Sequence, residues 1–388
     1  AVLTARAAEV PPGPAVVRVA DTLAAFGALA RAWRDRLGIK VVAVTGSSGK
    51  TSTKEAIADL LGRFAPTARS FANYNNEVGV PLTLLGLRPG PEVAVLELAM
   101  RGPGEIRYLT EIARPDVGVI TNIGTAHIGR LGSQDAIAQA KGELLAAMGP
   151  QGVAVLNGDD PRCRALGAGR ETARFFSAAG PAGAHVFART PLEPDGDHWA
   201  FTAAWDGGTS RVRLSIPGTH HVQNALAALT VALALGYAPP PALTLAPPPV
   251  GGRSRLVAVG DVEVLDESYN ANPESVRATL ESFCALPCQG RRVVVLGDMA
   301  ELGDFAEEAH RAIGRHLDDL PVDLVVAVGD LAALIAETTA REALRCRSNA
   351  EAVEALGRAL RAGDRLLVKG SRAGRLEEII AGLSEVYA

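Results

Sequence analysis

The sequence predicts an α/β fold built on parallel sheets, and three features of its 388 residues lead to that prediction. First, short apolar runs alternate with segments of helical period. The runs lie at 41–44, 93–98, 117–121 and 153–157, and a second series lies at 262–265, 291–296, 323–328 and 365–368. Second, uninterrupted runs of this kind are typical of strands buried on both faces of a parallel sheet. Third, the runs end in polar loops, and open parallel sheets bind ligands at the carboxyl ends of their strands.

The two series of strands suggest two α/β domains with a linker between them. Residues 22–38 predict an amphipathic helix that Gly38 ends. A helix is also expected within 217–236, and the proline-rich stretch 239–252 that follows is the best candidate for a hinge. We therefore expect a short N-terminal segment at 1–38, a central domain at 39–238, a linker at 239–254 and a C-terminal domain at 255–388.

Composition excludes several classes of partner. The formal net charge is −4, and no stripe of basic residues appears, so the sequence gives no electrostatic case for nucleic-acid binding. No apolar run is long enough to span a membrane, and no signal peptide is visible. We therefore expect neither a nucleic-acid partner nor a membrane span.

The stretch TGSSGKT at 45–51 has the features of a phosphate-binding loop. It joins a predicted strand to a predicted helix, and Gly46 and Gly49 allow positive φ and a close approach of the backbone to an anion. Lys50 adds a positive charge, and the Thr51 hydroxyl is suited to Mg²⁺. The usual spacing G-x4-G-K-[ST] would place glycine at position 44, where this chain has Val44. The residues expected to touch a nucleotide here are Thr45, Gly46, Ser47, Ser48, Gly49, Lys50, Thr51 and Ser52.

Three further side chains follow the neighbouring strands. Glu97 ends the run 93–98, at the position where a Mg²⁺-binding carboxylate belongs beside a phosphate loop. His127 comes shortly after 117–121, and Lys141 lies in a predicted helix. Taken alone, His127 is more often an ordinary hydrogen-bonded loop residue, and Lys141 is a lysine on a helix surface.

These segments together resemble the Mur ligase family, the ATP-dependent amide ligases of peptidoglycan assembly. The resemblance extends over nearly everything from Val41 onward, with the motifs in the family's order. The segments that carry it in the first half are TGSSGKT, NYNNEVGVPLTLL (73–85), ELAMRGPGEI (97–106), TNIGTAHIGRLGS (121–133) and AKGE (140–143). Those in the second half are PGTHHVQNALAA (217–228), DESYNANPES (266–275), VLGDMAELG (295–303) and KGSR (369–372).

The resemblance implies a fold and a reaction. The expected fold is a central P-loop-type doubly wound domain and a C-terminal Rossmann-like α/β domain, preceded by a short remnant of the family's N-terminal UDP-binding domain. The motifs are most similar to those of the members that join D-Ala-D-Ala to UDP-N-acetylmuramoyl-tripeptide. ATP would convert the tripeptide carboxylate into an acyl phosphate, which the dipeptide amine would then attack.

The resemblance also assigns roles to individual residues. Thr51 and Glu97 would hold the Mg²⁺ that bridges the β- and γ-phosphates, and His127 would help to hold a second Mg²⁺. Lys141 matches the family lysine that reacts with CO2 to give a carbamate, so the expected metal set is Thr51, Glu97, His127 and Lys141. The expected catalytic set is Lys50, Glu97, His127 and Lys141.

The remaining implied contacts lie in both domains. Nucleotide contacts are expected from Asn224, Arg255, Asp266 or Glu267, Tyr269 and Asn270. Substrate contacts are expected from Asn73, Asn75, Asn76, Lys369, Ser371 and Arg372. Three departures from the family pattern stand out. The segment before the phosphate loop is shorter than the family's UDP-binding domain, His221 replaces a usual asparagine, and DES at 266–268 leaves open which acid would contact the ribose.

Other functions fit parts of the same pattern. A Mur ligase that adds diaminopimelate or lysine would want a DNPR-like motif in the last domain, which this sequence lacks. A folylpolyglutamate synthetase would share the phosphate loop but not YNANP or GDMAELG. A nucleotide-dependent switch or ATPase without ligase activity would release phosphate whether or not an acceptor amine is present. The third residue of the tripeptide, lysine or diaminopimelate, stays open.

Overall fold

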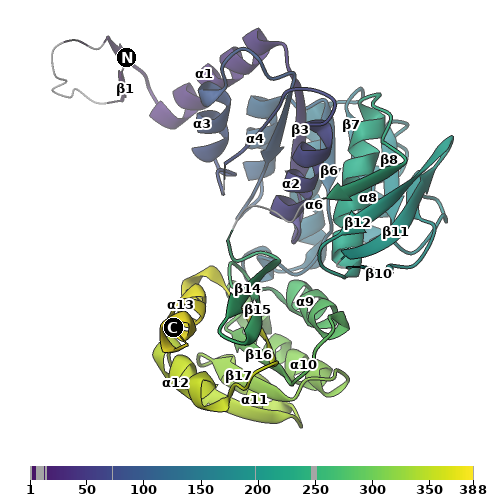
Figure 1. Cartoon of the computed structure of the whole chain (residues 1–388). Helices are drawn as coiled ribbons and strands as arrows, with labels where there is room; N and C mark the ends of the chain where they lie inside the picture. The colour runs from purple at the N-terminus through teal and green to yellow at the C-terminus, as the bar shows by residue number, and fades with distance from the viewer. Residues whose placement is uncertain are drawn as a thin grey trace. The chain divides into compact units, whose positions relative to one another are not determined.

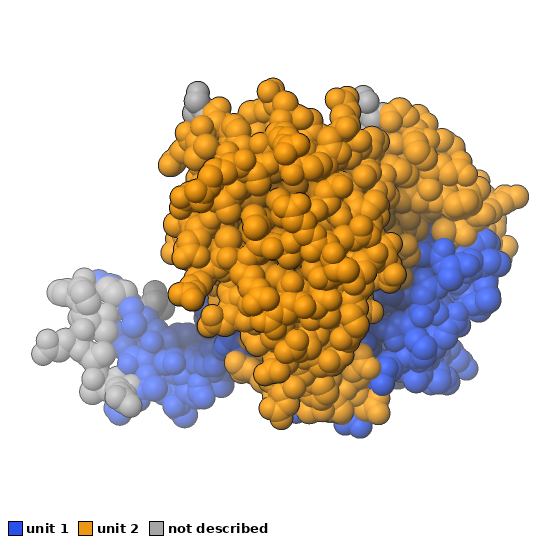
Figure 2. All heavy atoms as spheres, turned by 90° about the horizontal axis from the view of Figure 1, so that it is seen from below, with its two compact units in different colours: residues 1–123, 138–187, 224–240 blue, residues 124–137, 188–223, 241–388 orange. Residues whose placement is uncertain are grey.

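The computed structural model describes residues 2–5, 13, 15–71, 73–196, 198–245 and 251–387. The chain divides into two compact units that interleave along the sequence. The first unit comprises residues 1–123, 138–187 and 224–240, and the second comprises 124–137, 188–223 and 241–388 (Figure 2). Each unit is described by itself.

The first part of the chain alternates strands and helices as expected (Figure 1). Its elements up to the fourth helix are β1 (Val2–Thr4), β2 (Val16–Arg18), α1 (Thr22–Leu37), β3 (Lys40–Thr45), α2 (Lys50–Leu61), β4 (Thr67–Arg69), α3 (Gly79–Gly86), β5 (Val93–Glu97) and α4 (Glu105–Ala113). They are followed by β6 (Val117–Ile120), α5 (Ile128–Leu131), α6 (Gln134–Met148), β7 (Val153–Asn157), α7 (Pro161–Gly167), β8 (Ala173–Ser177) and β9 (Val186–Ala188).

Local signals explain where these helices begin and end. The Asp21 side chain accepts hydrogen bonds from the amides of Leu23 (2.8 Å) and Ala24 (3.0 Å), so it caps the start of α1. Gly38 follows α1 with φ 63°, the left-handed conformation that commonly ends a helix. The predicted helix 22–38 is therefore confirmed, with Gly38 as its stop.

The strands of the first unit form a parallel sheet in the order β9-β8-β7-β6-β3-β5-β4. β3 lies between β6 and β5, so the loops after these three strands share one edge of the sheet. All residues of β5 and β6 are buried, as the uninterrupted apolar runs predict. The prediction of parallel α/β sheets is confirmed for this unit.

The next segment is mostly antiparallel and was not predicted. It consists of β10 (Glu193–Asp195), β11 (His198–Trp205) and β12 (Gly208–Leu214), and β13 (Ala242–Leu245) pairs parallel to β12. β12 alternates buried and exposed residues, which gives a weaker sequence signal than a continuous apolar run. The helix expected within 217–236 is present as α8 (Thr219–Ala234).

The C-terminal part contains a six-stranded sheet in the order β14-β15-β19-β16-β17-β18, with only β14 antiparallel. Its elements are β14 (Arg255–Val259), β15 (Val262–Glu267), α9 (Pro273–Ala285), β16 (Arg292–Gly297), η1 (Gly303–Phe305), α10 (Ala306–Asp318), β17 (Leu324–Val328), α11 (Ala333–Thr338), β18 (Glu342–Cys346), α12 (Asn349–Ala359), β19 (Arg365–Lys369), η2 (Arg372–Gly374) and α13 (Glu377–Val386). The predicted second parallel sheet is confirmed.

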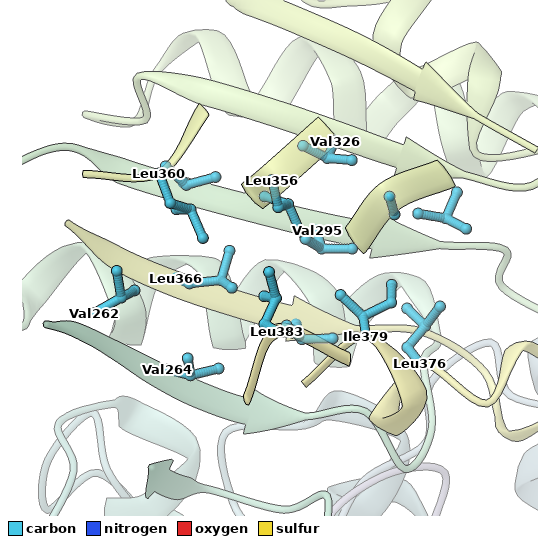
Figure 3. Close-up of a cluster of buried hydrophobic side chains, with 14 of the residues drawn as sticks. Val262, Val264, Val295, Val326, Leu356, Leu360, Leu366, Leu376, Ile379 and Leu383 are labelled. Carbon is cyan, nitrogen blue, oxygen red and sulfur yellow. The ribbon is translucent and has the colours of Figure 1, made fainter. Parts of the chain in front are cut away.

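One face of this sheet packs on α12 and α13. Val264, Val295 and Val326 from three strands meet Leu356 of α12 and Leu383 of α13 in a cluster of buried side chains (Figure 3). Burial of such side chains removes apolar surface from water and stabilises the layer by about 1.5–3 kcal/mol each. The packed layer holds the carboxyl ends of β15 and β19 in register.

The ends of the predicted domains lie partly outside the described residues. Residues 6–12 and 14 of the predicted remnant and residues 246–250 of the predicted linker belong to this group. The boundaries at 38, 238 and 254 therefore stay predictions. No helix among the described residues is long and apolar enough to cross a membrane.

Candidate active site

The loop between β3 and α2 is shaped by two glycines. Gly46 has φ +152°, and a Cβ added to it would lie 1.8 Å from the hydroxyl oxygen of Thr121. Gly49 has φ +75° and stands at the start of α2 without a side-chain cap. The backbone amides of the helix start are therefore left for another partner, as in an anion site.

The segment after β6 holds this loop in place. Asn122 accepts hydrogen bonds from the amides of Ser47 through its carbonyl (3.0 Å) and of Ser48 through its side chain (3.0 Å). The Thr121 hydroxyl donates to the Ser48 carbonyl at 2.6 Å. Sequence reasoning did not assign roles to Thr121 and Asn122, although the quoted segment TNIG contains both.

Two hydroxyls in the loop lack a protein partner. Among the described residues, the buried oxygens Thr45 Oγ1 and Ser47 Oγ accept or donate no hydrogen bond. Burial of an unpaired hydroxyl is unfavourable, so such groups indicate a ligand or water. Together with the close backbone turn at Gly46 and the ammonium of Lys50, they fit a bound phosphate group. Ser52 lies in the first turn of α2.

Thr51 and Glu97 meet at the loop, as predicted for a Mg²⁺ site. The Thr51 hydroxyl donates to Glu97 Oε2 at 2.7 Å, and Glu97 is only 2% exposed. The Asn75 side chain donates to the other carboxylate oxygen at 2.8 Å. These oxygens suit a hard cation. Within the described ranges, no group of three or more His, Cys, Asp or Glu side chains could hold a metal.

The other two asparagines of the NYNN segment have different surroundings. The Asn76 side chain accepts from the amide of Gly79 at 2.9 Å and so caps the start of α3. Asn73 is exposed, and its carbonyl accepts from the Asn75 amide at 2.8 Å. Of the three predicted substrate contacts, only Asn75 touches the Glu97 carboxylate.

Lys141 reaches the phosphate loop from α6. Its ammonium donates to the Gly46 carbonyl at 2.9 Å, and the residue is 1% exposed. Lys50 donates to the same carbonyl at 2.9 Å. Burial, followed by the nearby charge of Lys50, lowers the pKa of Lys141 well below its ordinary value of 10.5. Lys141 is therefore no helix-surface lysine, and its amine is biased toward the neutral form.

Asn224 of α8 also lies at the loop. Its side-chain oxygen accepts from the Thr53 hydroxyl at 2.8 Å and would be 3.3 Å from a Cβ on Gly49. The first unit thus brings together five of the predicted groups: Lys50, Thr51, Glu97, Lys141 and Asn224.

His127 belongs to the second unit, while Thr51, Glu97 and Lys141 belong to the first. His127 has φ +67°, and its Nδ1 lies 2.5 Å from Glu301 Oε2. The same segment is held by Glu274, which accepts from the Thr125 amide at 2.8 Å. Sequence reasoning missed both carboxylates, because neither lies near His127 in the chain.

The two acids of DES have distinct partners in the second unit. Asp266 is 8% exposed and accepts from the Gly252 amide (3.1 Å) and from the Ser268 hydroxyl (2.6 Å). Glu267 accepts from the amide and hydroxyl of Ser254 and lies 3.6 Å from the Lys369 ammonium. Both carboxylates therefore help to fix the turn at 252–254.

The predicted contacts beyond the DES segment surround Lys369. Its ammonium donates to the Asn270 carbonyl at 3.0 Å, and burial lowers its pKa although Glu267 opposes that shift. The guanidinium of Arg253 lies 4.2 Å from the centre of the Tyr269 ring, a cation–π contact that the sequence did not reveal. Tyr269, Asn270 and Lys369 thus form one cluster at the ends of β15 and β19.

The remaining predicted residues lie around this cluster. Ser371 is 4% exposed and its amide donates to the Asp298 carbonyl, and the exposed Arg372 pairs with Glu377 at 2.5 Å. Arg255 begins β14 opposite Asp266. The His221 ring lies against that of His220, tilted by 41° with the ring centres 4.0 Å apart, and burial lowers the pKa of His221.

Comparison with known proteins connects this arrangement to a family. The Mur ligase middle domain matches residues 44–232, and the Mur ligase glutamate ligase domain matches 252–372. The chain is 40% identical over 377 residues to the UDP-N-acetylmuramoyl-tripeptide–D-alanyl-D-alanine ligase of Synechocystis, covering 94% of this chain and 79% of that protein.

Solved structures give the same picture. A crystal structure of MurF from Acinetobacter baumannii superposes with a TM-score of 0.87 at 35% identity, covering 99% of this chain and 84% of that one. The MurF ligase of Thermotoga maritima, solved in complex with ADP, gives a TM-score of 0.89 at 28% identity, covering all of this chain and 88% of that one. The E. coli FolC structure, at 18% identity and a TM-score of 0.67, shares the fold alone.

Proposed function

The chain belongs to the Mur ligase family, and from that premise we propose that it is an ATP-dependent ligase joining D-Ala-D-Ala to UDP-N-acetylmuramoyl-tripeptide. The names of its relatives support this reaction, which belongs to the synthesis of peptidoglycan precursors. The observation that carries the proposal is the arrangement at the phosphate loop. The Thr51 hydroxyl donates a hydrogen bond to one oxygen of the Glu97 carboxylate, and the Asn75 side chain donates to the other.

The loop would bind the triphosphate. The turn at Gly46, the hydroxyls of Thr45 and Ser47 and the Lys50 ammonium are suited to phosphate oxygens. ATP with Mg²⁺ supplies a γ-phosphoryl group that can activate a carboxylate. Thr51 and Glu97 would hold the ion, and Asn75 would orient Glu97. Binding of ADP by the Thermotoga relative supports use of ATP.

The substrate carboxylate would be activated as an acyl phosphate beside Lys50. The carboxylate oxygen attacks the γ-phosphorus, the bond to the bridging oxygen breaks, and ADP leaves. The dipeptide amine then attacks the acyl carbon, phosphate departs and the amine loses its proton. Lys50 offsets negative charge that increases as the reactants approach.

We propose that Lys141 becomes a carbamate. Its neutral amine would attack the carbon of CO2, forming an N–C bond, while an electron pair moves to oxygen and a proton leaves to solvent. Burial and the neighbouring Lys50 favour the neutral amine that this step needs. The product would be an oxygen ligand for a second Mg²⁺ with His127, which no arginine could provide.

The carbamate has a direct test. Lys141→Ala should lose activity and regain part of it when a short carboxylic acid such as acetate fills the space. Lys40→Ala, which changes an exposed lysine paired with Asp116, should be neither impaired nor stimulated. Full activity of Lys141→Ala without acid would contradict the role.

The second unit would supply the other contacts. Asp266 or Glu267, Tyr269 and Asn270 would lie near the ribose and base, with Arg255. Lys369, Ser371 and Arg372 would approach the ATP phosphates or the dipeptide. A protein of this kind would work as a cytoplasmic monomer on small-molecule substrates.

An ADP-release assay tests the ligase proposal. The purified protein should release ADP from ATP and UDP-N-acetylmuramoyl-tripeptide much faster when D-Ala-D-Ala is added. L-Ala-L-Ala serves as a matched acceptor control and should not stimulate. Robust ATP hydrolysis that neither dipeptide changes would favour an ATPase and contradict the proposal.

A further inference from the structure

A cavity of about 300 Å³ lies in the first unit, where the start of α4 faces α1. Its apolar wall is formed by Leu23, Pro103, Tyr108 and Leu109. The Tyr108 hydroxyl donates to the Leu23 carbonyl at 3.3 Å, so this wall joins the two helices. A cavity of this size lies at the lower end of the range of ligand pockets and can hold one extended side chain.

The cavity borders the carboxylate that is proposed to bind Mg²⁺. Ala99 lines it and follows Glu97 by two residues, a chain length of at most ~7 Å. The Ala99 amide donates to the Asn75 carbonyl at 2.8 Å, while the Asn75 side chain donates to Glu97. The loop that carries Glu77, a further lining residue, is thereby fixed beside the site of carboxylate activation.

The charged groups of the cavity are acidic. Glu77 and Glu105 line it, and none of its described lining residues is Lys, Arg or His. The pKa of the Tyr108 phenol is raised. Burial is the largest cause, and the negative charges of Asp21 and Glu77 add to it. Glu105 accepts from the Arg101 amide at 2.7 Å, which fixes the position of its carboxylate at the rim. A cationic group would gain from these negative charges and an anionic group would not.

We propose that this cavity receives the side chain of the third residue of the tripeptide, and that it selects a side chain ending in an ammonium, as in lysine, over one that also ends in a carboxylate. The inference rests on the proposed ligase function. It concerns the same reaction but a different part of the substrate.

The geometry favours this residue over the rest of the substrate. The α-carboxylate of the third residue is the group that ATP activates, so its side chain must begin within a few bonds of the phosphate loop. A four-carbon stem can lie along Leu23 and Tyr108 while the ammonium stays at the carboxylates and in contact with water. The additional carboxylate of diaminopimelate would meet Glu77 and Glu105, and like charges repel.

Three substrates separate the charge from the shape of the side chain. UDP-N-acetylmuramoyl-tripeptides that end in L-lysine, meso-diaminopimelate or norleucine would be compared by D-Ala-D-Ala-dependent ADP release. We expect the KM for the lysine substrate to be about tenfold lower than that for the diaminopimelate substrate. The norleucine substrate, which keeps the stem without the ammonium, should lie between them.

Variants then locate the effect. Glu77→Gln should raise the KM for the lysine substrate about fivefold, the scale of one solvent-accessible ion pair, and leave the KM for norleucine and every kcat unchanged. Glu111→Gln changes an exposed glutamate farther along α4 that does not line the cavity, and it should change none of these values. Glu105→Gln should act in the same direction as Glu77→Gln.

The outcomes distinguish this inference from the ligase proposal. A lower KM for diaminopimelate, or an equal effect of Glu77→Gln on all three substrates, would overturn the inference while ligase activity persists. Absence of D-Ala-D-Ala-dependent ADP release with every substrate would overturn the ligase proposal, and the inference with it.

Discussion

Lys50 and Lys141 both donate to the carbonyl oxygen of Gly46, each at 2.9 Å. Two ammonium groups on one acceptor repel each other. Lys141 is buried, whereas Lys50 is only partly buried. The structure therefore favours loss of the proton from Lys141, whose pKa is lowered by burial and by Lys50. Lys141 of α6 thus contacts the phosphate loop and is biased toward the neutral amine that the proposed carbamate requires.

Replacing Lys141 should stabilise the protein while it removes activity. With a depressed pKa, the folded protein binds fewer protons than the unfolded chain between that value and the ordinary value of 10.5. Stability should therefore rise with pH across this window and fall as the pH is lowered. In Lys141→Met the dependence disappears, and we expect a gain of about 1–2 kcal/mol at pH 7, because Lys50 still satisfies the carbonyl.

Urea unfolding at pH 7 and pH 9 in CO2-depleted buffer measures this effect. Lys40→Met is the matched control, since the Lys40 side chain is 64% exposed, and it should leave the pH dependence of wild type intact. Equal pH dependence of wild type and Lys141→Met would show that Lys141 does not titrate anomalously.

Gly46→Ala should abolish nucleotide binding. The added Cβ would lie 1.8 Å from the Thr121 hydroxyl at a φ of +152°, so the loop must move. We expect a loss of about 1–3 kcal/mol in stability and no detectable ADP binding by calorimetry. Gly86→Ala has open space around its Cβ and should bind ADP as wild type does. Unchanged ADP affinity in Gly46→Ala would mean that the loop does not contact phosphate.

Thr51→Val should impair the use of Mg²⁺ while the protein still folds. Valine keeps the shape of threonine but cannot donate the 2.7 Å hydrogen bond to Glu97. We expect kcat to fall about 100-fold, with a raised Mg²⁺ requirement, and Thr51→Ser to restore most of the activity. The control Thr83→Val removes a hydroxyl that bonds only its own helix, at Gly79. An Mg²⁺ titration identical to that of wild type would argue against Thr51 as a ligand.

Lys369, which is buried, and its partly buried partner Glu267 should show strong coupling in a stability measurement. In the wild type the Glu267 carboxylate lies 3.6 Å from the Lys369 ammonium, and the Lys369 side chain is 3% exposed. Glu267→Gln removes this charge partner and leaves the buried ammonium unpaired by charge. We expect a loss of about 3 kcal/mol, most of which Lys369→Met should restore in the double variant.

A surface pair on the same two strands provides the comparison. Glu263 pairs with Arg365 across β15 and β19, and Glu263 is 42% exposed on its side chain. Glu263→Gln should cost less than ~1 kcal/mol. A double variant no more stable than Glu267→Gln would show that the two groups act independently.

Much of the fold could be predicted because its information is local. The apolar runs at β3, β5 and β6 are buried on both faces, and the glycines between β3 and α2 mark the loop. Thr51 and Glu97 could be paired in advance, since adjacent parallel strands bring their carboxyl ends to one edge. The antiparallel strands β11 and β12 escaped prediction because neither has a continuous apolar run: β12 alternates buried and exposed residues, and β11 mixes buried and half-buried ones.

The contacts that support the site depend on segments far apart in the chain. The contacts of Asn122 with the phosphate loop, of Asn75 with Glu97 and of Glu301 with His127 follow from strand order and packing. No spacing in the sequence indicates them. The buried state of Lys141 is another example, since a helix segment with mixed polarity does not reveal which face meets the sheet.

The most direct test of the proposed reaction is the stoichiometry of its products. The protein would be incubated with ATP, Mg²⁺, UDP-N-acetylmuramoyl-tripeptide and D-Ala-D-Ala, and the nucleotide and peptide products quantified by mass spectrometry. We predict one ADP for each UDP-N-acetylmuramoyl-pentapeptide formed. ADP that accumulates without pentapeptide, or AMP in place of ADP, would contradict the account.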